Sequence, residues 1–210
     1  MANDYYLHVV IELASASIQP RHSQLSARPI LSHPFPAMSE EIFDVVNDRD
    51  EVIGRERRSE VHRLGLKHRA VHVFVFNARG ELFLQKRSML KDNHPGVWDS
   101  SSSGHLDAGE DYDACAIREL GEEIGLFSEQ APTRLFKVAA CSETGEEFVW
   151  LYRCEAEGPF TLHPEEIDDG GWFAPAALAK WLEQKPHEFA PAFVLIWRLL
   201  LERNHLNLSP

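Results

Sequence analysis

Three glutamates, Glu119, Glu122 and Glu123, stand within five residues of the chain, shortly before Gly125. Like charges on adjacent helix turns repel one another, so this crowding costs free energy in an isolated helix. Carboxylate oxygens are the ligands that the hard cations Mg²⁺ and Mn²⁺ prefer, and a bound cation would offset the repulsion. The alternative is an acidic face that only contacts solvent. The spacing therefore raises the question of whether these residues bind a metal.

The neighbouring residues predict the helix that positions the three glutamates. Asp111 is an N-cap candidate, because its carboxylate can accept hydrogen bonds from the backbone N–H groups of the first turn. Gly125 is a candidate C′ residue that ends the helix. With a rotation of about 100° per residue, Ile117, Leu120 and Ile124 fall on one side and the glutamates on the other. We expect the helix to pack through its aliphatic side and to direct the three carboxylates outward together.

The same stretch resembles a family motif. Residues 104–126, GHLDAGEDYDACAIRELGEEIGL, match the Nudix box, G-x5-E-x7-R-E-U-x-E-E-x-G-U, in which U is an aliphatic residue. Every specified position is filled at a fixed spacing, which makes the match a specific one. The matching residues are Gly104, Glu110, Arg118, Glu119, Leu120, Glu122, Glu123, Gly125 and Leu126. The chain thus resembles a Nudix hydrolase, and the order of the expected strands extends this resemblance over residues 40–205.

The resemblance implies a catalytic metal centre. In Nudix hydrolases water attacks a diphosphate that carries a further group, X, and the glutamates of the box bind divalent cations. Carried over, Glu119, Glu122 and Glu123 are catalytic residues and metal ligands, with Gly104 as a further ligand. The implied cofactor is Mg²⁺, for which Mn²⁺ can substitute. The cation would neutralise phosphate oxygens and lower the pKa of the attacking water.

Other positions of the box would support this centre. Arg118 is expected to pair with a carboxylate and to orient it, with Glu110 beside it. Gly104 would let the loop turn and let the backbone approach the site. The general base is left open by the resemblance, because family members take it from inside or outside the box. The candidates outside the box are Glu146, Glu147, Glu165 and Glu166.

A finer resemblance lies upstream of the box. Residues 66–106 resemble isopentenyl-diphosphate isomerase, a member of the Nudix superfamily that moves a double bond in a C5 diphosphate without hydrolysing it. Its metal site uses histidines, which His68 and His105 match, and His62 matches a third with a spacing shifted by one residue. Glu147 aligns with one of its metal-binding glutamates.

Two further comparisons with the isomerase point in opposite directions. Arg87 and Lys91, four residues apart, match its diphosphate-binding arginine and lysine. However, Ser103 stands where the isomerase has its catalytic cysteine, and a hydroxyl is a much weaker proton-transfer group than a thiol. The acids of the box are also complete here. The better match is therefore the subgroup that shares the upstream segment with the isomerase and keeps a complete box. In that subgroup His68 and His105 are expected to be core residues or to support the site, with metal ligation as the alternative.

Hydrophobic patterns predict the elements around the box. FDVV and EVIG flank a turn composition, NDRD, and indicate a hairpin. Two strands are expected around Gly80, and two more around the SETGEE turn. Helices are expected after Pro175 and in PAFVLIWRLLLERN. We predict the α/β Nudix fold, an α/β/α sandwich around a mixed sheet, over residues 38–208. Residues 1–37, rich in Ser and Pro, are expected to form an unstructured or loosely docked extension.

Charge and composition limit the classes of molecule that this protein can be expected to bind. The formal net charge of −12 repels a nucleic-acid backbone, so a small-molecule diphosphate is expected rather than a nucleic-acid polymer. The three cysteines form no CxxC pair and favour a reducing, cytoplasmic compartment. Because no segment reaches the roughly 20 apolar residues of a membrane span, no membrane partner is expected. Oligomeric state stays open, a homodimer included.

Three functions are compatible with these residues. The first is a Mg²⁺-dependent hydrolase of a nucleoside diphosphate derivative or a related organic diphosphate. The second is an isopentenyl-diphosphate isomerase-like enzyme, which Ser103 disfavours. The third is a non-catalytic Nudix module that binds a ligand. Such modules often lose acids of the box, and this chain has lost none.

Overall fold

The expected strands and helices recur in the computed structural model, which describes residues 40–203. The predicted extension, residues 1–37, lies outside the described residues. The strands are β1 (Ile42–Val46), β2 (Val52–Arg57), β3 (His68–Phe76), β4 (Leu82–Arg87), β5 (Trp98–Asp99), β6 (Ser102–His105), β7 (Thr133–Val138), β8 (Glu147–Glu155) and β9 (Ile167–Phe173). The helices are α1 (Arg58–Leu64), α2 (Tyr112–Ile124), α3 (Pro175–Gln184) and α4 (Pro191–Glu202), with short 3-10 turns η1 (Ser142–Thr144) and η2 (Pro186–Glu188).

Local turn chemistry explains the three predicted hairpins, which are all confirmed. Strands β1 and β2 pair antiparallel around a turn in which Oδ1 of Asn47 accepts from the N–H groups of Arg49 and Glu51. Strands β3 and β4 meet around Gly80, whose φ of 73° suits a glycine. Strands β7 and β8 pair antiparallel on either side of η1. Helix α1 and the short strands β5 and β6 were not predicted, because each is too short to show a period.

The central sheet is mixed, as predicted. Its order is β5-β4-β3-β8-β7, with β6 paired to β3 and β9 paired to β4. Strands β3 and β8 run parallel, and the other pairs are antiparallel. Strand β6 takes the part of the β3 edge that β4 leaves free, with Val71 opposite Gly104 and Ala70 opposite His105. The first half of the box thereby becomes part of the sheet.

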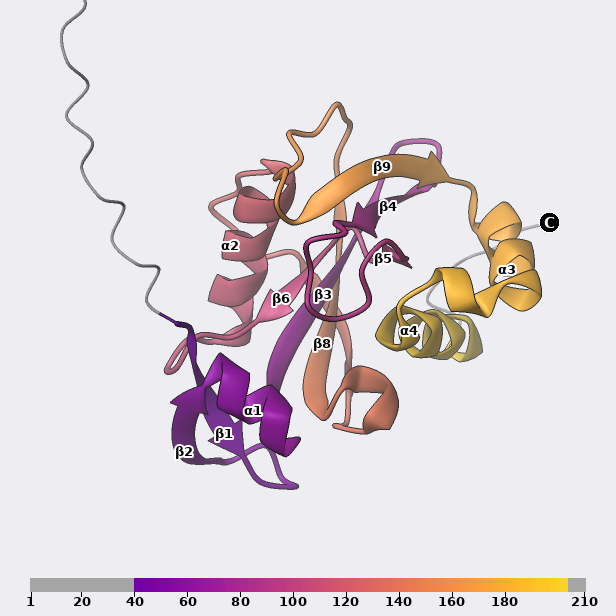
Figure 1. Ribbon diagram of the computed structural model, residues 1–210. Helices are drawn as coiled ribbons and strands as arrows, with labels where there is room; N and C mark the ends of the chain where they lie inside the picture. The colour runs from indigo at the N-terminus through magenta and orange to yellow at the C-terminus, as the bar shows by residue number, and fades with distance from the viewer. Residues whose placement is uncertain (1–39, 204–210) are drawn as a thin grey trace, which may run out of the picture. The chain divides into compact units, whose positions relative to one another are not determined.

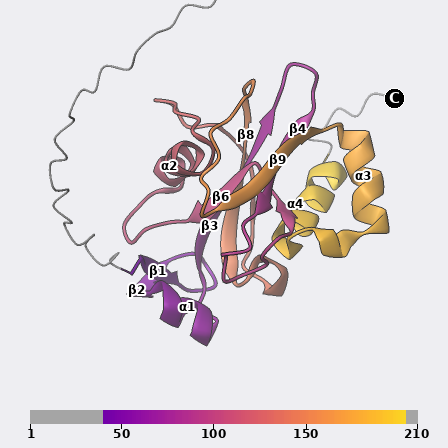
Figure 2. The ribbon, with the colours of Figure 1, turned by 45° about the horizontal axis from the view of Figure 1, so that its top comes forward.

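Alternation along β3 builds two hydrophobic cores, one on each face of the sheet. Val71, Val73 and Val75 pack with the apolar side of α2. Ala70, Phe74 and Phe76 pack with α3 and α4. Figures 1 and 2 show α2 on one side of the sheet and α3 with α4 on the other. The α/β/α sandwich predicted from the sequence is therefore confirmed.

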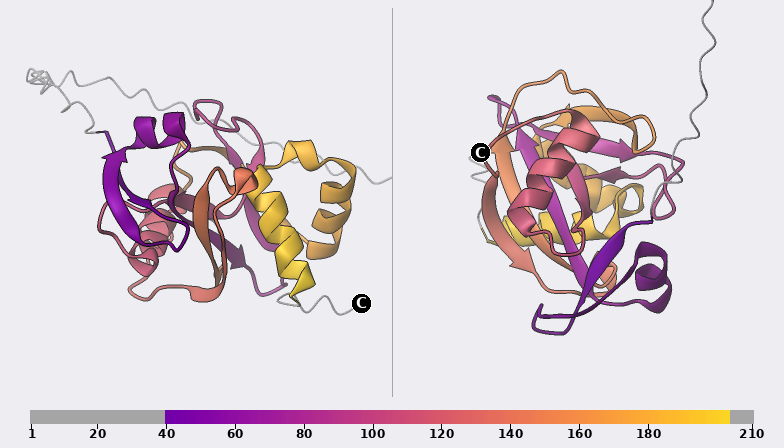
Figure 3. Two further views of the ribbon diagram at one scale, coloured as in Figure 1. Left: turned by 90° about the horizontal axis from the view of Figure 1, so that it is seen from below. Right: turned by 90° about the vertical axis from the view of Figure 1, so that its left-hand side faces the viewer.

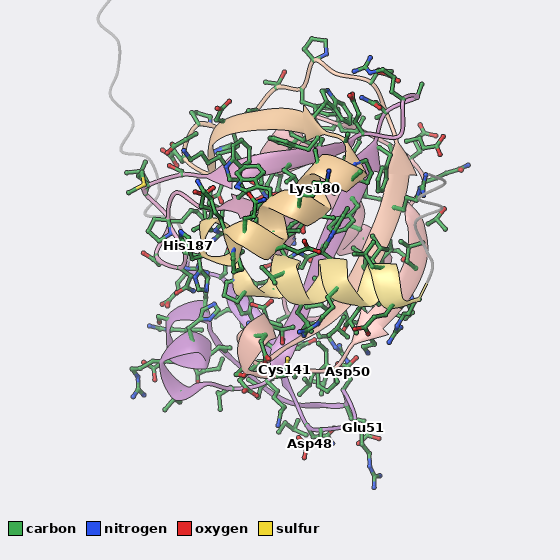
Figure 4. The ribbon with its side chains drawn as sticks, turned by 90° about the vertical axis from the view of Figure 1, so that its right-hand side faces the viewer. Asp48, Asp50, Glu51, Cys141, Lys180 and His187 are labelled. Carbon is green, nitrogen blue, oxygen red and sulfur yellow. The ribbon has the colours of Figure 1, made fainter. Side chains whose placement is uncertain are left out.

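The first hairpin and α1 form a small lobe at one end of the sheet, as the views in Figure 3 show. Asp50, which is labelled in Figure 4, lies in the turn between β1 and β2. Its contacts link this lobe to the sheet and to α2. Its carboxylate accepts from Nε of Arg69 at 2.6 Å and from the Tyr112 hydroxyl at 3.1 Å, and it also pairs with Lys137. These contacts hold the lobe, and with it α1, against the core.

Candidate functional site

The helix of the box has the ends that the sequence predicts. Asp111 is the N-cap, and its Oδ1 accepts from the N–H groups of Asp113 and Ala114 at 2.9 and 3.0 Å. Gly125 ends the helix in the left-handed conformation, with a φ of 68°. Leu120 and Ile124 are buried in the core beneath α2. The capping residues and the buried apolar residues of segment 111–125 thus determine the orientation of α2, and with it the positions of its acidic side chains.

The three glutamates do not point outward together, which corrects the expectation from the helix pattern. Glu122 alone is exposed, whereas Glu119 and Glu123 are 8% and 5% exposed and face the sheet. The reason is that both flank the apolar stripe closely. Glu123 finds polar partners on β6 and β4, whereas Glu119 lies against Gly104 and pairs with Arg118. Two buried carboxylates therefore lie side by side between α2 and the sheet, with a third at the rim.

Gly104 makes room for the first of these carboxylates. A Cβ atom on this residue would lie 2.0 Å from Oε1 of Glu119 and 2.1 Å from its Cδ. Gly104 lies within strand β6, so the expected role in a turn is wrong. The expected close approach of the backbone is what the structure displays. The motif needs glycine at this position because the Glu119 carboxylate occupies the space that a side chain would fill.

Hydrogen bonds fix the second carboxylate. Oε2 of Glu123 accepts from the Ser103 N–H at 2.8 Å and from Nε2 of Gln85 at 3.2 Å. Sequence reasoning missed Gln85, although a single polar residue in the apolar strand LFLQ was a signal for it. Burial raises the pKa of both Glu119 and Glu123 above the ordinary range, and in Glu119 the neighbouring Glu123 adds to the increase. A divalent cation between them would favour the charged forms.

Arg118 connects the acids of the box to one another, as the resemblance implied. Its Nε and Nη2 donate to the two oxygens of Glu110 at 2.9 and 2.8 Å. Its Nη1 donates to Glu119 at 2.7 Å and to Glu122 at 3.0 Å. Its Nη2 also donates to the carbonyl oxygen of His105 at 2.9 Å. One guanidinium thus orients two candidate metal ligands and ties α2 to β6.

The two cations expected to bind diphosphate are both paired with acids. Arg87 donates to Asp99 at 3.3 Å and to the carbonyl oxygen of Asn93 at 3.1 Å. Lys91 pairs with Glu166. The turn that carries Glu166 lies against the end of α2, because the His163 N–H donates to the carbonyl oxygen of Glu123 at 2.8 Å. Lys91 and Glu166 therefore belong to the edge of the carboxylate site.

Three histidines and a glutamate form a second cluster. His62 on α1, His68 on β3 and His105 on β6 have ligand atoms that all lie within 4.8 Å of one another. Nε2 of His105 lies 3.0 Å from Oε1 of Glu147, and Nε2 of His68 lies 3.6 Å from the same atom. Although the spacing of His62 in the sequence is shifted by one residue, α1 places the centroid of its ring 5.1 Å from the centroids of the His68 and His105 rings.

The chemistry of this histidine cluster, His62, His68, His105 and Glu147, fits a transition metal. Nε2 of His62 and Nε2 of His68 are buried and have no hydrogen-bond partner among the described residues. Buried polar atoms without partners are rare and call for a ligand. Burial, with a smaller effect from the charges of His105 and His68, lowers the pKa of His62 to about 4, so its imidazole is neutral. Neutral imidazoles with one carboxylate suit Zn²⁺, Mn²⁺ or Co²⁺.

The two clusters occupy opposite faces of the sheet. Along β6, Gly104 pairs with Val71, which faces α2, whereas His105 pairs with Ala70, which faces α4. Side chains alternate between faces along a strand. The carboxylate site, Glu119, Glu122 and Glu123, and the histidine cluster are thus separated by one strand. Among the outside glutamates, Glu147 belongs to the histidine cluster and Glu166 to the carboxylate site.

Comparisons with known proteins agree with this geometry. The model of the NUDIX domain matches residues 66–193. An uncharacterised Nudix hydrolase of Yersinia pestis is 33% identical over 174 residues, which cover 81% of this chain and 91% of the relative. The isopentenyl-diphosphate Delta-isomerase of Paenarthrobacter aurescens is 32% identical over 175 residues, 80% of this chain and 95% of that protein. The chain therefore belongs to the Nudix hydrolase family, a class of enzymes that cleave diphosphate linkages.

A solved structure supports the fold. The DR0079 protein of Deinococcus radiodurans is 27% identical and superposes with a TM-score of 0.64, over 77% of this chain and 98% of that one. The relatives of this chain thus include both proteins named as Nudix hydrolases and an isomerase, in agreement with the two resemblances in the sequence. Among residues 40–203, no helix combines the length and the apolar character of a membrane span.

Proposed function

We propose that the chain hydrolyses a small organic diphosphate, such as a nucleoside diphosphate derivative, at the carboxylate site with Mg²⁺ or Mn²⁺. The observation that carries the proposal is the pair of buried carboxylates of Glu119 and Glu123 against Gly104. Burying two acids side by side is unfavourable unless a cation compensates them. Oxygen ligands at this density suit Mg²⁺ and Mn²⁺.

Each residue of the site has a role in this reaction. Glu119, Glu122 and Glu123 hold the cation, and Arg118 orients the first two. When bound, the cation neutralises phosphate oxygens and lowers the pKa of the attacking water. Lys91 binds an oxygen of the diphosphate. Because the chain has a net charge of −12, the positive charges of the bound cation and of Lys91 are needed to attract an anion to the site.

We assign the proton acceptor to Glu166. Its turn is fixed on the end of α2, and its charge acts on Glu123. Glu147 is already paired with His105, and Glu165 is exposed. Glu166 takes a proton from water, the water oxygen bonds to phosphorus, and the bridging P–O bond breaks with its electron pair leaving on the departing phosphate group.

The test is a hydrolysis screen with a panel of organic diphosphates, in which released phosphate, pyrophosphate and phosphate monoesters are all measured. It includes nucleoside di- and triphosphates, ADP-ribose, dinucleotides, NADH, coenzyme A and thiamine diphosphate, each with Mg²⁺ and with Mn²⁺. We expect turnover of one class, its loss on chelation and its recovery on adding Mg²⁺. Turnover that survives chelation would contradict the proposal.

The unpaired cysteines of the described chain, Cys115, Cys141 and Cys154, agree with a reducing, cytoplasmic setting.

A second candidate function is isomerisation of a C5 diphosphate, and the histidine cluster is the observation in its favour. It supplies three imidazoles and Glu147 on the face of β6 that also bears the Ser103 side chain. A hydroxyl in place of a thiol is a poor proton-transfer group, so we rank isomerisation below hydrolysis. Incubation with isopentenyl diphosphate decides between them, because formation of the dimethylallyl isomer would establish the second function.

A further inference from the structure

Lys91 and Glu166 bridge the two loops at the edge of the carboxylate site. Lys91 lies in the loop after β4, and Glu166 lies directly before β9. The loops are also joined through the backbone, where the Ser88 N–H donates to the carbonyl oxygen of Glu166 at 2.8 Å. The Met89 N–H donates to Oδ2 of Asp168 at 3.0 Å. The frame that carries the ion pair is therefore fixed without it.

The side chains of the pair are free to separate. The Lys91 and Glu166 side chains are 22% and 35% exposed, so water can solvate both charges when they part. Arg87 differs, because its side chain is 15% exposed and donates to Asp99 and to the carbonyl oxygen of Asn93. Removing Arg87 from Asp99 would take this partner from Oδ2 of a buried carboxylate. Lys91 is thus the cation suited to change partners.

The ion pair also lies near Glu123, one of the proposed metal ligands. The backbone explains the proximity, since the Glu166 N–H donates to the carbonyl oxygen of His163, whose own N–H donates to the carbonyl oxygen of Glu123. A diphosphate held at the carboxylate site by a cation would meet Lys91 at this edge.

We propose that Lys91 exchanges Glu166 for the diphosphate of the substrate, so that Glu166 holds Lys91 in the free enzyme and competes with the diphosphate for it. This exchange rests on the proposed function, because it assumes that the carboxylate site binds a diphosphate. A partly exposed ion pair between two single charges is weak. A diphosphate with several charged oxygens is a stronger partner for an ammonium group. The exchange frees the Glu166 carboxylate when the substrate arrives.

Calorimetric binding of imidodiphosphate, a diphosphate analogue with a P–N–P bridge, in the presence of Mg²⁺ tests the exchange. We expect Lys91→Ala to weaken binding about tenfold, because a charge-assisted hydrogen bond is lost. We expect Glu166→Gln to tighten binding about threefold, because a competing ion pair is removed. Glu165→Gln, the matched control, removes the same charge from an exposed neighbouring residue and should leave the affinity unchanged.

The double variant Lys91→Ala/Glu166→Gln separates exchange from simple repulsion. If Glu166 acts by holding Lys91, Glu166→Gln has no effect on affinity once Lys91 is absent. Equal tightening with and without Lys91 would overturn the exchange, as would weaker binding by Glu166→Gln or no binding by the unmodified chain. Because binding is measured without turnover, a failure of the proposed hydrolysis stays distinguishable from a failure of the exchange.

Discussion

Glu119 lies so close over Gly104 that the glycine has no room for a side chain: a Cβ atom there would meet Oε1 of Glu119 at 2.0 Å. This contact joins α2 to β6 and fixes where one buried carboxylate can lie. The atoms that a Cβ would meet belong to the far end of a side chain. A substitution at this position therefore moves the carboxylate rather than the backbone.

Gly104→Ala should remove most of the activity while the protein stays folded. A displacement of about 1 Å at a reacting site costs on the order of a hundredfold in rate. The matched control is Gly54→Ala in β2, where a Cβ atom would meet nothing within 4 Å. Turnover and thermal midpoint are measured for both variants. An unchanged rate in Gly104→Ala would show that the position of Glu119 does not matter for the reaction.

Arg118→Lys should weaken the binding of Mg²⁺. A lysine keeps the charge but cannot contact Glu110, Glu119 and Glu122 at once, because it lacks the planar fork of donors. Loss of a residue that orients metal ligands lowers metal affinity by about 10- to 100-fold. The Mg²⁺ concentration for half-maximal turnover reports this. Arg134→Lys serves as the control, because Arg134 pairs with Asp113 at the other end of α2. This variant should leave that Mg²⁺ concentration unchanged.

The histidine cluster should bind a transition metal in the absence of any substrate. Co²⁺ added to the metal-free protein should give a visible absorption band, and His62→Gln or His68→Gln should remove it. His187→Gln changes an exposed histidine outside the cluster and should leave the band intact. No band in the unmodified protein, or an unaltered band in His68→Gln, would contradict the assignment. Elemental analysis of the dialysed protein gives an independent measure of bound metal.

Acidification should destabilise the fold through His72, which is buried and whose Nδ1 lies 2.6 Å from Oγ of Ser100. Burial lowers the pKa of His72 below its ordinary value of 6.5, although Asp99 opposes the shift. Below pH 6.5 the imidazole of the unfolded chain binds a proton, whereas His72 in the native chain stays neutral until the pH reaches its lowered pKa. The free energy of unfolding therefore falls as the pH falls through this range.

Denaturation between pH 7 and pH 5 measures this loss, which one proton limits to about 1.4 kcal/mol per pH unit. His72→Asn keeps a polar atom near Ser100 and removes the titrating group. Its stability should therefore fall less steeply with acid than that of the unmodified chain. Equal slopes for the two proteins would show that His72 is not the group responsible.

Local sequence signals predicted much of the fold and of the site. Asp111 and Gly125 bound α2 because a cap depends on a few neighbouring residues. The hairpins follow from turn residues such as Asn47 and Gly80 for the same reason. The motif also brought together the residues that Arg118 contacts. Each of these features depends on short stretches of chain, which a single sequence displays.

Features that depend on distant partners could not be predicted. The helix pattern placed Glu119 and Glu123 opposite the aliphatic residues, yet both are buried. Glu123 finds polar partners on β6 and in Gln85, and Glu119 fits into the space that Gly104 leaves. His62 completes the histidine cluster through α1, an element of seven residues that is too short to show a period. The separation of the two clusters also follows from the pairing of β6 with β3, which no local pattern encodes.

The central claim is that buried carboxylates of the box hold the cation for hydrolysis, and Glu123→Gln tests it most directly. Glutamine preserves the shape of the side chain and can accept from the Ser103 N–H, but it removes the charge that a cation needs. We predict that this variant stays folded and loses turnover of the substrate class found in the screen, by at least about a hundredfold. Glu129→Gln, beyond the end of α2, is the control and should keep the full rate. Undiminished turnover by the Glu123→Gln protein would contradict the account.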